Sequence, residues 1–289
     1  MKKYKIKSVV DDFIKADQKI RQESSLKKKI SVWTKFFSKP HQELFNVYHN
    51  WGWKKYLPIM FKNYDKKYKI AEIKRNEKTA QKLIPEILQK ISKVIVPKNQ
   101  IPTILFVGLH LTNGFVDKYK NKYTTFLNLE SYDDAPTLKI FITHELLHNI
   151  HLQKNPGIYY WKGNRASWYH SLILEGVATY LTKRVLKVSA ADALWGKYLN
   201  KKECQQFMAW CKKNKSKLKR QLLVVINKTK REESSFFGGR RPRGCPYYRT
   251  GYYLGLDFVE NLSRRMSLEK IVLLKGEKLK KEIINYLEN

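Results

Sequence analysis

The sequence is poor in cysteine and has no long hydrophobic run. Its 289 residues contain three cysteines, Cys204, Cys211 and Cys245, without the close spacing of a metal-binding pair. We interpret them as free thiols, which is typical of a reducing compartment. No apolar run of about seven to fifteen residues follows the basic start, and none reaches about eighteen. These absences argue against a secretory signal and a transmembrane segment, and we expect a cytoplasmic protein, with export by a route that needs no signal still open.

Acidic residues are also scarce. Asp and Glu number 25 against 58 Lys and Arg, for a formal net charge of +33. The excess is +16 in residues 1–100, +4 in 101–190 and +13 in 191–289, counted on the same sequence. Such a charge favours polyanions: nucleic acid, an anionic surface such as a membrane, or an acidic protein. A lysine-rich solvated surface explains it equally well, because no nucleic-acid-binding motif is present. Two basic segments stand out late in the chain: Lys212–Arg220, and a Gly- and Arg-rich loop or arm over residues 238–244.

The most informative motif is His144-Glu145-Leu146-Leu147-His148. Start signals at 133–137 and apolar residues at helical spacing from Leu138 to Ile150 predict that it lies in the middle of a helix, which Asn155-Pro156-Gly157 ends. Two histidines four residues apart then share one helix face, with a carboxylate on its flank. This pattern predicts a Zn²⁺ site held by His144 and His148, with Glu145 as the general base. The alternative is an ordinary amphipathic helix with paired polar side chains.

A catalytic zinc ion needs a third protein ligand, and Glu175 in Leu174-Glu175-Gly176-Val177-Ala178-Thr179-Tyr180 is the best candidate. The small residues at 176 and 178 predict that this second helix comes close to the first. With this pair of helices the chain resembles the gluzincin clan of zinc peptidases. The Glu-Gly-x-Ala-x-Tyr pattern looks most like bacterial families of predicted zinc-dependent proteases. His170 is an alternative third ligand, and we expect His151 to lie around the metal or on the substrate side.

The implied mechanism is hydrolysis of a peptide bond by a zinc-bound water that Glu145 activates. A donor is still needed for the oxyanion of the tetrahedral intermediate. The run Tyr252-x-x-Gly255-x-x-Phe258, with Leu262 after it, resembles the gluzincin helix that carries a tyrosine for this purpose. Tyr252 is therefore the candidate, and Tyr248, expected one turn earlier on the same helix, is the reserve. Amphipathic packing of the tyrosines is the alternative.

The resemblance implies a zincin-like α+β fold: a small mixed sheet, an active-site helix and a mainly helical C-terminal half. Apolar runs predict strands at Thr103–Leu111 and Tyr123–Glu130, and we expect the second to be the sheet edge that pairs with an extended substrate. We predict a basic helical N-terminal region, 1–100, and a zincin-like metallopeptidase domain, 101–289. An endopeptidase is the favoured function. The alternative is a catalytically silent protein of the same fold that binds nucleic acid or another polyanion through its basic flanks.

Overall fold

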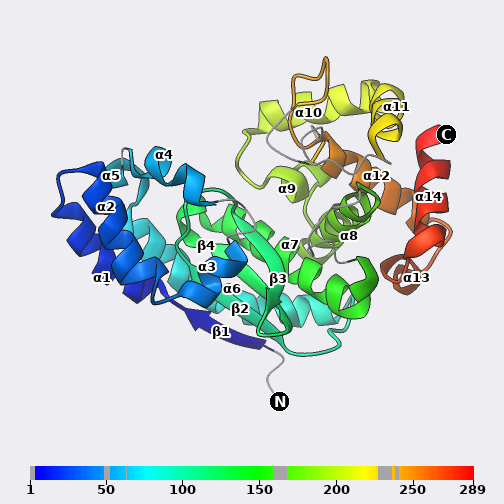
Figure 1. Cartoon of the computed structure of the whole chain (residues 1–289). Helices are drawn as coiled ribbons and strands as arrows, with labels where there is room; N and C mark the ends of the chain where they lie inside the picture. Colours follow the sequence, from blue (N-terminus) through cyan, green and yellow to red (C-terminus); the bar gives the residue numbers. More distant parts are fainter. Residues whose placement is uncertain (1–3, 49–52, 63, 159–167, 227–235, 238–240) are drawn as a thin grey trace. The chain divides into compact units, whose positions relative to one another are not determined.

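A computed structural model describes residues 4–48, 53–62, 64–158, 168–226, 236–237 and 241–289. The chain forms two units (Figure 1). The first contains residues 1–89 and 99–149, and the second contains residues 90–98 and 150–289. Two of the three boundaries fall within long helices, α6 (Ile70–Ser92) and α7 (Ala135–Lys154), and the third lies between α6 and the first strand that follows it.

The first unit is built around a four-stranded mixed sheet with the order β1-β2-β4-β3. Strands β1, β2 and β4 are parallel, and β3 pairs antiparallel with β4. The predicted α+β class with a small mixed sheet is therefore confirmed. The strands are β1 (Tyr4–Ser8), β2 (Ile101–Phe106), β3 (Gly114–Tyr119) and β4 (Lys122–Asn128).

Helices cover both faces of this sheet. Adjacent residues of a strand point to opposite faces, so neighbouring residues of β4 contact different helices. Phe126 of β4 stacks on Phe115 with ring centroids 4.6 Å apart, and Phe115 in turn stacks on Tyr48 of α3 (Gln42–Tyr48). The neighbouring Thr125 accepts a hydrogen bond from Asn149 of α7 at 3.1 Å. One face therefore packs on α3 and the other on α7.

The edge of the sheet differs from the prediction. Lys122–Asn128 is an interior strand between β2 and β3, so it is not the edge strand. The edges among the described residues are β1 and β3. Strand β3 was not predicted, because Asp117 and Lys118 interrupt its apolar pattern. Strand β1 was not predicted either, and it joins the mainly helical N-terminal segment to the sheet through its pairing with β2.

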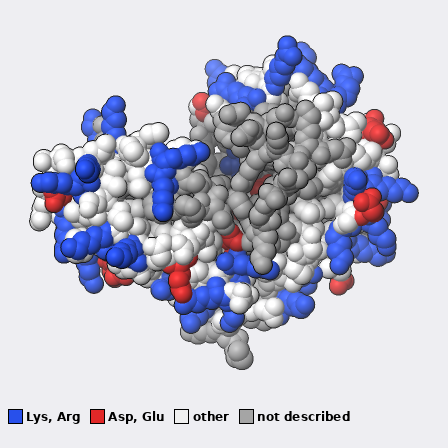
Figure 2. Space-filling view, viewed as in Figure 1, with Lys and Arg blue, Asp and Glu red and all other residues white. Residues whose placement is uncertain are grey.

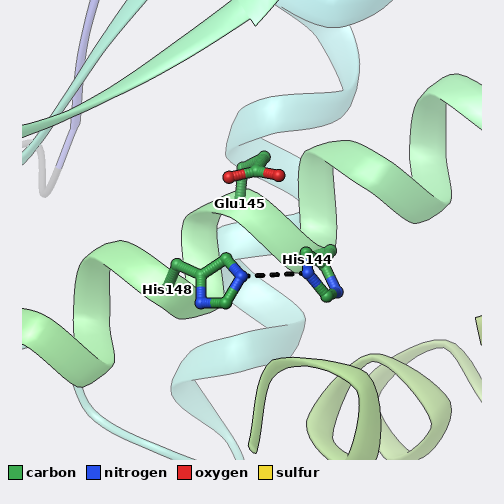
Figure 3. Close-up of side chains that lie close together, drawn as sticks. All are labelled: His144, Glu145 and His148. Atoms are coloured by element: carbon green, nitrogen blue, oxygen red, sulfur yellow. Dashed lines mark hydrogen bonds between the residues drawn. The ribbon is translucent and has the colours of Figure 1, made fainter. Parts of the chain in front are cut away.

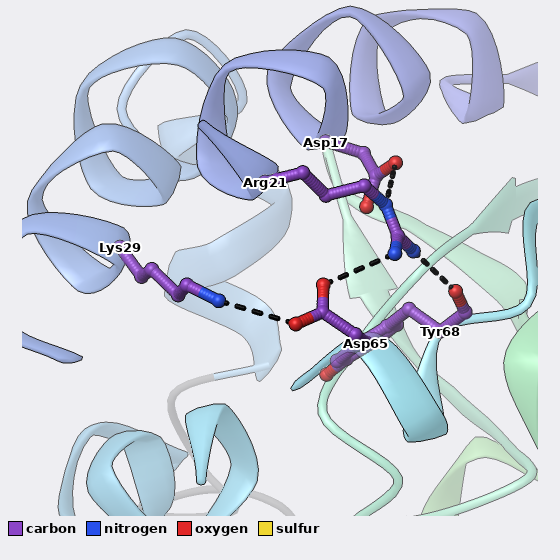
Figure 4. A network of polar contacts seen from close by, with 5 residues as sticks. All are labelled: Asp17, Arg21, Lys29, Asp65 and Tyr68. Carbon is purple, nitrogen blue, oxygen red and sulfur yellow. Dashed lines mark hydrogen bonds and ion pairs between the residues drawn. The ribbon is translucent and has the colours of Figure 1, made fainter. Parts of the chain in front are cut away.

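The N-terminal helices are held together by aromatic packing and by one polar network (Figure 4). Arg21 donates to the buried Asp17 at 2.8 Å, to Asp65 at 3.0 Å and to the carbonyl of Tyr68 at 2.7 Å, and Lys29 reaches Asp65 at 3.3 Å. The network joins three helices. The remaining helical elements of this unit are α1 (Val10–Arg21), α2 (Leu26–Trp33), a π-helical turn (Thr34–Ser38), a 3-10 turn (Trp53–Tyr56), α4 (Leu57–Phe61), α5 (Tyr64–Lys67) and a 3-10 turn (Leu129–Ser131).

The regular secondary structure described in the second unit is helical. Its central contact joins α8 (Trp168–Leu186) to α12 (Thr250–Ser263) at a pair of glycines. A Cβ atom on Gly176 would lie 2.3 Å from the carbonyl oxygen of Gly255, so only glycine permits this approach. Gly176 thus packs on α12, whereas we had expected it to face the metal helix. The other elements are a 3-10 turn (Pro156–Ile158), α9 (Ala190–Trp195), α10 (Lys201–Lys213), α11 (Lys215–Ile226), α13 (Leu268–Val272) and α14 (Gly276–Glu288).

Across the described residues, every helix is too short or too polar to cross a bilayer.

Candidate metal centre

Helix α7 begins and ends where the sequence predicts. The side chain of Asp134 accepts a hydrogen bond from the backbone N–H of Thr137 at 2.7 Å and caps the first turn. The helix ends at Lys154, immediately before Asn155 and Pro156. The motif at 144–148 therefore lies in the middle of a helix, where residues four apart share a face.

The imidazole rings of His144 and His148 face one another across one helical turn (Figure 3). Their Nε2 atoms are 2.9 Å apart and their ring planes are nearly perpendicular, at 87°. His144 is buried, and His148 is partly buried. Two nitrogen lone pairs at this separation repel one another unless a proton or a cation lies between them. The two nitrogens can therefore share a proton in a hydrogen bond or hold a cation between them.

Glu145 lies beside this pair and is also buried, with 6% of its surface exposed. One carboxylate oxygen and the two histidine nitrogens all lie within 4.8 Å of one another. The side chain packs under the first residue of the edge strand β3. A Cβ atom on Gly114 would be 2.7 Å from Cγ of Glu145, so the glycine leaves room for the carboxylate.

Buried hydrogen bonds hold α7 against the sheet. Asn149, next to His148, is fully buried and donates to the carbonyl of Tyr123 at 3.0 Å and to the hydroxyl of Thr125. Because both acceptors belong to β4, the position of the histidine turn is tied to the sheet. Asn149 was not among the residues that the sequence pointed to. A lone amide among apolar helix positions was the available signal.

A second group of hydrogen bonds fixes the loop that leads into Gly114. The side chain of Asn128 donates to the carbonyl of Thr112, and the hydroxyl of Tyr132 donates to the carbonyl of Asn113 at 2.6 Å. The hydroxyl of Thr112 donates to the carbonyl of Gly114 at 2.7 Å. These bonds position the start of β3 directly beside Glu145.

His151, which we expect around the metal or on the substrate side, also anchors the end of α7. It is 1% exposed, and its Nε2 donates to the carbonyl of Val272 at 3.1 Å. Asn155 donates to the same carbonyl and to that of Leu274. Together they attach the end of α7 to the segment around α13 within the second unit.

The other predicted ligands lie on α8 in the second unit. Glu175 is in the middle of this helix and partly buried, and His170 is in its first turn. Burial lowers the pKa of His170, which keeps its imidazole neutral near pH 7. Lys183, two turns beyond Glu175 on α8, forms an ion pair with Glu260 at 2.6 Å.

Tyr252 lies in the first turn of α12, also in the second unit. Its ring is covered by the guanidinium of Arg249 at 4.2 Å and lies 5.9 Å from the ring of Phe237. Tyr248 precedes the helix, because Arg249 takes a left-handed backbone conformation (φ 59°) at the N-cap. The expectation that Tyr248 shares a helix face with Tyr252 is therefore wrong. Arg249 also contacts Trp195, so it is packed between rings and does not lie free on the surface.

The residues on α7 fit a zinc ion by their chemistry. Two nitrogens bound to one tetrahedral zinc at about 2.0 to 2.1 Å lie about 3.3 Å apart, a few tenths of an ångström more than the separation of this pair. A neutral imidazole is a common zinc ligand, and a neighbouring carboxylate can act on a water at the ion. His144, Glu145 and His148 form the group of His, Cys, Asp or Glu side chains, among the described residues, that lie close enough together to hold a metal ion.

The connection between α7 and α8 is rich in aromatic residues in the sequence, but its residues 159–167 fall outside the described part of the chain, as do the glycines at 238–239 and Arg240. Trp168 and Tyr169, which follow this connection, are buried at the start of α8.

Comparison with known proteins agrees with this chemistry. Residues 80–281 match the model of a family described as "Predicted Zn-dependent protease (DUF2268)". The match includes α7, α8 and α12. No curated protein and no solved structure matches the chain. Since the family model covers more than half of the sequence and includes the histidine pair, the chain belongs to this family of predicted zinc-dependent proteases.

Proposed function

We propose that this protein is a zinc-dependent endopeptidase of the gluzincin type. The observation that carries the proposal is the convergence of the two Nε2 atoms, 2.9 Å apart, beside the buried carboxylate of Glu145. A purely structural metal site needs no general base at this position. The family description supports protease activity at a coarse level.

In this proposal His144, His148 and Glu175 hold the ion. The histidines supply two nitrogen ligands from one helix, and Glu175 supplies an oxygen ligand from α8. His170 is the alternative third ligand. When bound, the zinc ion supplies Lewis acidity that polarises a peptide carbonyl and lowers the pKa of water.

Glu145 and Tyr252 would carry the proton transfer and the stabilisation of charge. Glu145 accepts the proton from the attacking water and returns it to the leaving amine. The hydroxyl of Tyr252 donates a hydrogen bond to the oxyanion that develops on the carbonyl. Tyr252 is preferred to Tyr248 because it is held on α12, whereas Tyr248 lies before the helix.

The edge strand β3 is the proposed binding site for the substrate backbone. An extended peptide can add to an exposed strand edge through main-chain hydrogen bonds. Gly114, at the start of this strand, contacts Glu145, so a peptide paired there would run past the catalytic carboxylate. This assignment replaces the one that the sequence suggested for Tyr123–Glu130.

The first experiment is to measure zinc by elemental mass spectrometry after exhaustive dialysis. We expect about one zinc per wild-type chain and a marked loss in Glu175→Ala, with His170→Ala as the matched control from the same helix. Zinc lost in His170→Ala and retained in Glu175→Ala would make His170 the third ligand. A wild-type protein that takes up no zinc after reconstitution would contradict the proposal.

A further inference from the structure

Two segments of the second unit contain basic residues and no acidic ones. Residues 204–226 and 241–256 contain nine Lys and Arg and no Asp or Glu. Lys and Arg side chains gather over α10 and α11 at the top of Figure 2, whereas blue and red are mixed over α14. Six of these bases are exposed, and we call them the basic surface: Lys212, Lys213, Lys217, Arg220, Arg241 and Arg243.

The two segments of the basic surface lie side by side. The side chain of Gln221 donates to the carbonyl of Arg243 at 3.0 Å. A Cβ atom on Gly244 would be 3.4 Å from Nζ of Lys217. Lys217 and Arg241 both lower the pKa of the Cys245 thiol, which burial raises. Bases separated by more than twenty positions in the sequence therefore meet on one surface.

These bases are not used in ion pairs within the described part of the chain. None of the six forms a salt bridge there, whereas the neighbouring Lys215 pairs with Asp257 at 3.1 Å. The buried Lys219 donates to the carbonyl of Tyr286 at 2.8 Å. The cations that point outward thus remain available to a ligand, and their mutual repulsion favours an anionic one.

An exposed aromatic ring accompanies the bases. Tyr248 is 39% exposed, and the guanidinium of Arg241 lies 4.5 Å from the centre of its ring. A tyrosine and an arginine stacked in this way form a platform on which an unpaired nucleobase can stack, and nearby lysines can contact the phosphates. Nucleobases inside a duplex cannot reach such a platform.

The apolar residues of α11 argue against a membrane as the ligand. Leu218, Leu222 and Ile226 are at most 1% exposed, so the apolar face of this helix is used in the core. An amphipathic helix that binds a bilayer keeps its apolar face free for the lipid. Val224 is a single exposed hydrophobic residue on the outward side of α11, with 71% of its surface accessible.

We infer that the basic surface and Tyr248 form a binding site for single-stranded nucleic acid. The phosphates contact Lys217, Arg220, Arg241 and Arg243, and a base stacks on Tyr248. Lys212 and Lys213 extend the contact along α10. The site has a function separate from peptide hydrolysis and does not depend on a bound metal.

The test is fluorescence anisotropy with a labelled single-stranded oligonucleotide and the full-length protein at several salt concentrations. With six phosphate contacts, the logarithm of the affinity should fall with the logarithm of salt with a slope of about −4. The triple variant Lys217→Glu, Arg241→Glu, Arg243→Glu should halve this slope and weaken binding by about a hundredfold. Tyr248→Ala should weaken binding by about tenfold and leave the slope unchanged.

The matched control is Lys74→Glu, Lys78→Glu, Lys82→Glu, which changes the net charge equally at three exposed positions of α6. This control should lose less than about threefold, since it changes only the long-range field. Equal losses in the two triple variants would overturn the inference and assign the binding to overall charge. The inference would also be overturned if the protein bound anionic phosphatidylglycerol vesicles more tightly than the oligonucleotide and Tyr248→Ala changed neither affinity. Circular dichroism establishes that each variant is folded.

Discussion

Two regions of the molecule, one in each unit, carry positive charge in different ways. In the first, Arg21 and Lys29 are bound by Asp17 and Asp65, and three helices are joined by these contacts (Figure 4). In the second, the basic surface contains six exposed bases and no acid. The net charge is similar at the two ends of the chain, +16 in residues 1–100 and +13 in residues 191–289. Composition alone therefore does not show which basic residues are paired and which are free of ion pairs.

The difference lies in what each charge can do. A charge that is buried and paired fixes the conformation around it, and its removal leaves a partner unsatisfied. An exposed charge without a partner contributes little to stability and remains available to a ligand. The candidate metal centre belongs to the first kind, because Glu145 is buried beside the histidine pair. The four predictions below extend this contrast, in decreasing order of effect.

Glu145→Gln should have the largest effect. Removing a general base typically costs about a hundredfold to ten-thousandfold in rate, so we expect kcat/KM for an unfolded protein substrate to fall about a thousandfold. Zinc content should stay the same, because the amide is similar in size to the carboxylate. Glu288→Gln, an exposed change in α14, is the control. Unchanged hydrolysis by Glu145→Gln would exclude the proposed role.

Glu130→Gln should change the dependence of stability on pH. Glu130 is partly buried and accepts hydrogen bonds from the N–H groups of Gly108 and His110, and the burial of its carboxylate raises its pKa to about 7. The folded protein therefore keeps this proton to a higher pH than the unfolded chain, where the pKa is about 4.5. Wild-type stability should fall by about 3 kcal/mol relative to the variant between about pH 4.5 and 7, and then level off.

Urea unfolding of both proteins from pH 5 to 8 measures this difference. Comparison with the variant is needed because burial lowers the pKa values of His41 and His110, which act in the opposite direction in the same range. A constant difference across this range would show that Glu130 titrates normally.

Arg21→Met should lower the free energy of unfolding by about 2 kcal/mol. The substitution leaves the carboxylate of Asp17, which is 3% exposed, without its guanidinium partner. Breaking a fully buried pair costs about 3 to 5 kcal/mol, and the side chain of Arg21 is 35% exposed, which reduces the loss. In the double variant Asp17→Asn, Arg21→Met part of the loss should be recovered. A double variant no more stable than the single one would show that packing of the arginine accounts for the effect.

Lys217→Gln with Arg220→Gln should have the smallest effect on stability. Neither side chain is in a salt bridge with a described residue, so the free energy of unfolding should change by less than about 0.5 kcal/mol. The corresponding shift in Tm is about 1 to 2 °C. Destabilisation by more than about 1 kcal/mol would mean that these bases stabilise the fold, and would weaken the contrast between the units.

The sequence predicted the helices of the candidate site more accurately than the sheet. Helix α7 follows local signals, namely the cap at Asp134 and the stop after Lys154, and α8 and α12 include the predicted residues. The strand order could not be predicted, since strand pairing joins segments that are distant in the sequence. For this reason β4 was taken as an edge, and β3, with its polar residues, was missed.

What the sequence determined by itself is the pairing of His144 with His148, because two residues four positions apart in a helix share a face in any fold. Only the tertiary structure decided which strand borders Glu145 and which histidine supports the core. His151 donates to a carbonyl 121 residues away, and Arg21 pairs with an acid 44 residues away. The physical reason is the same in each case. A helix determines the spacing of its own side chains, whereas the partner of a side chain depends on which distant segment packs against it.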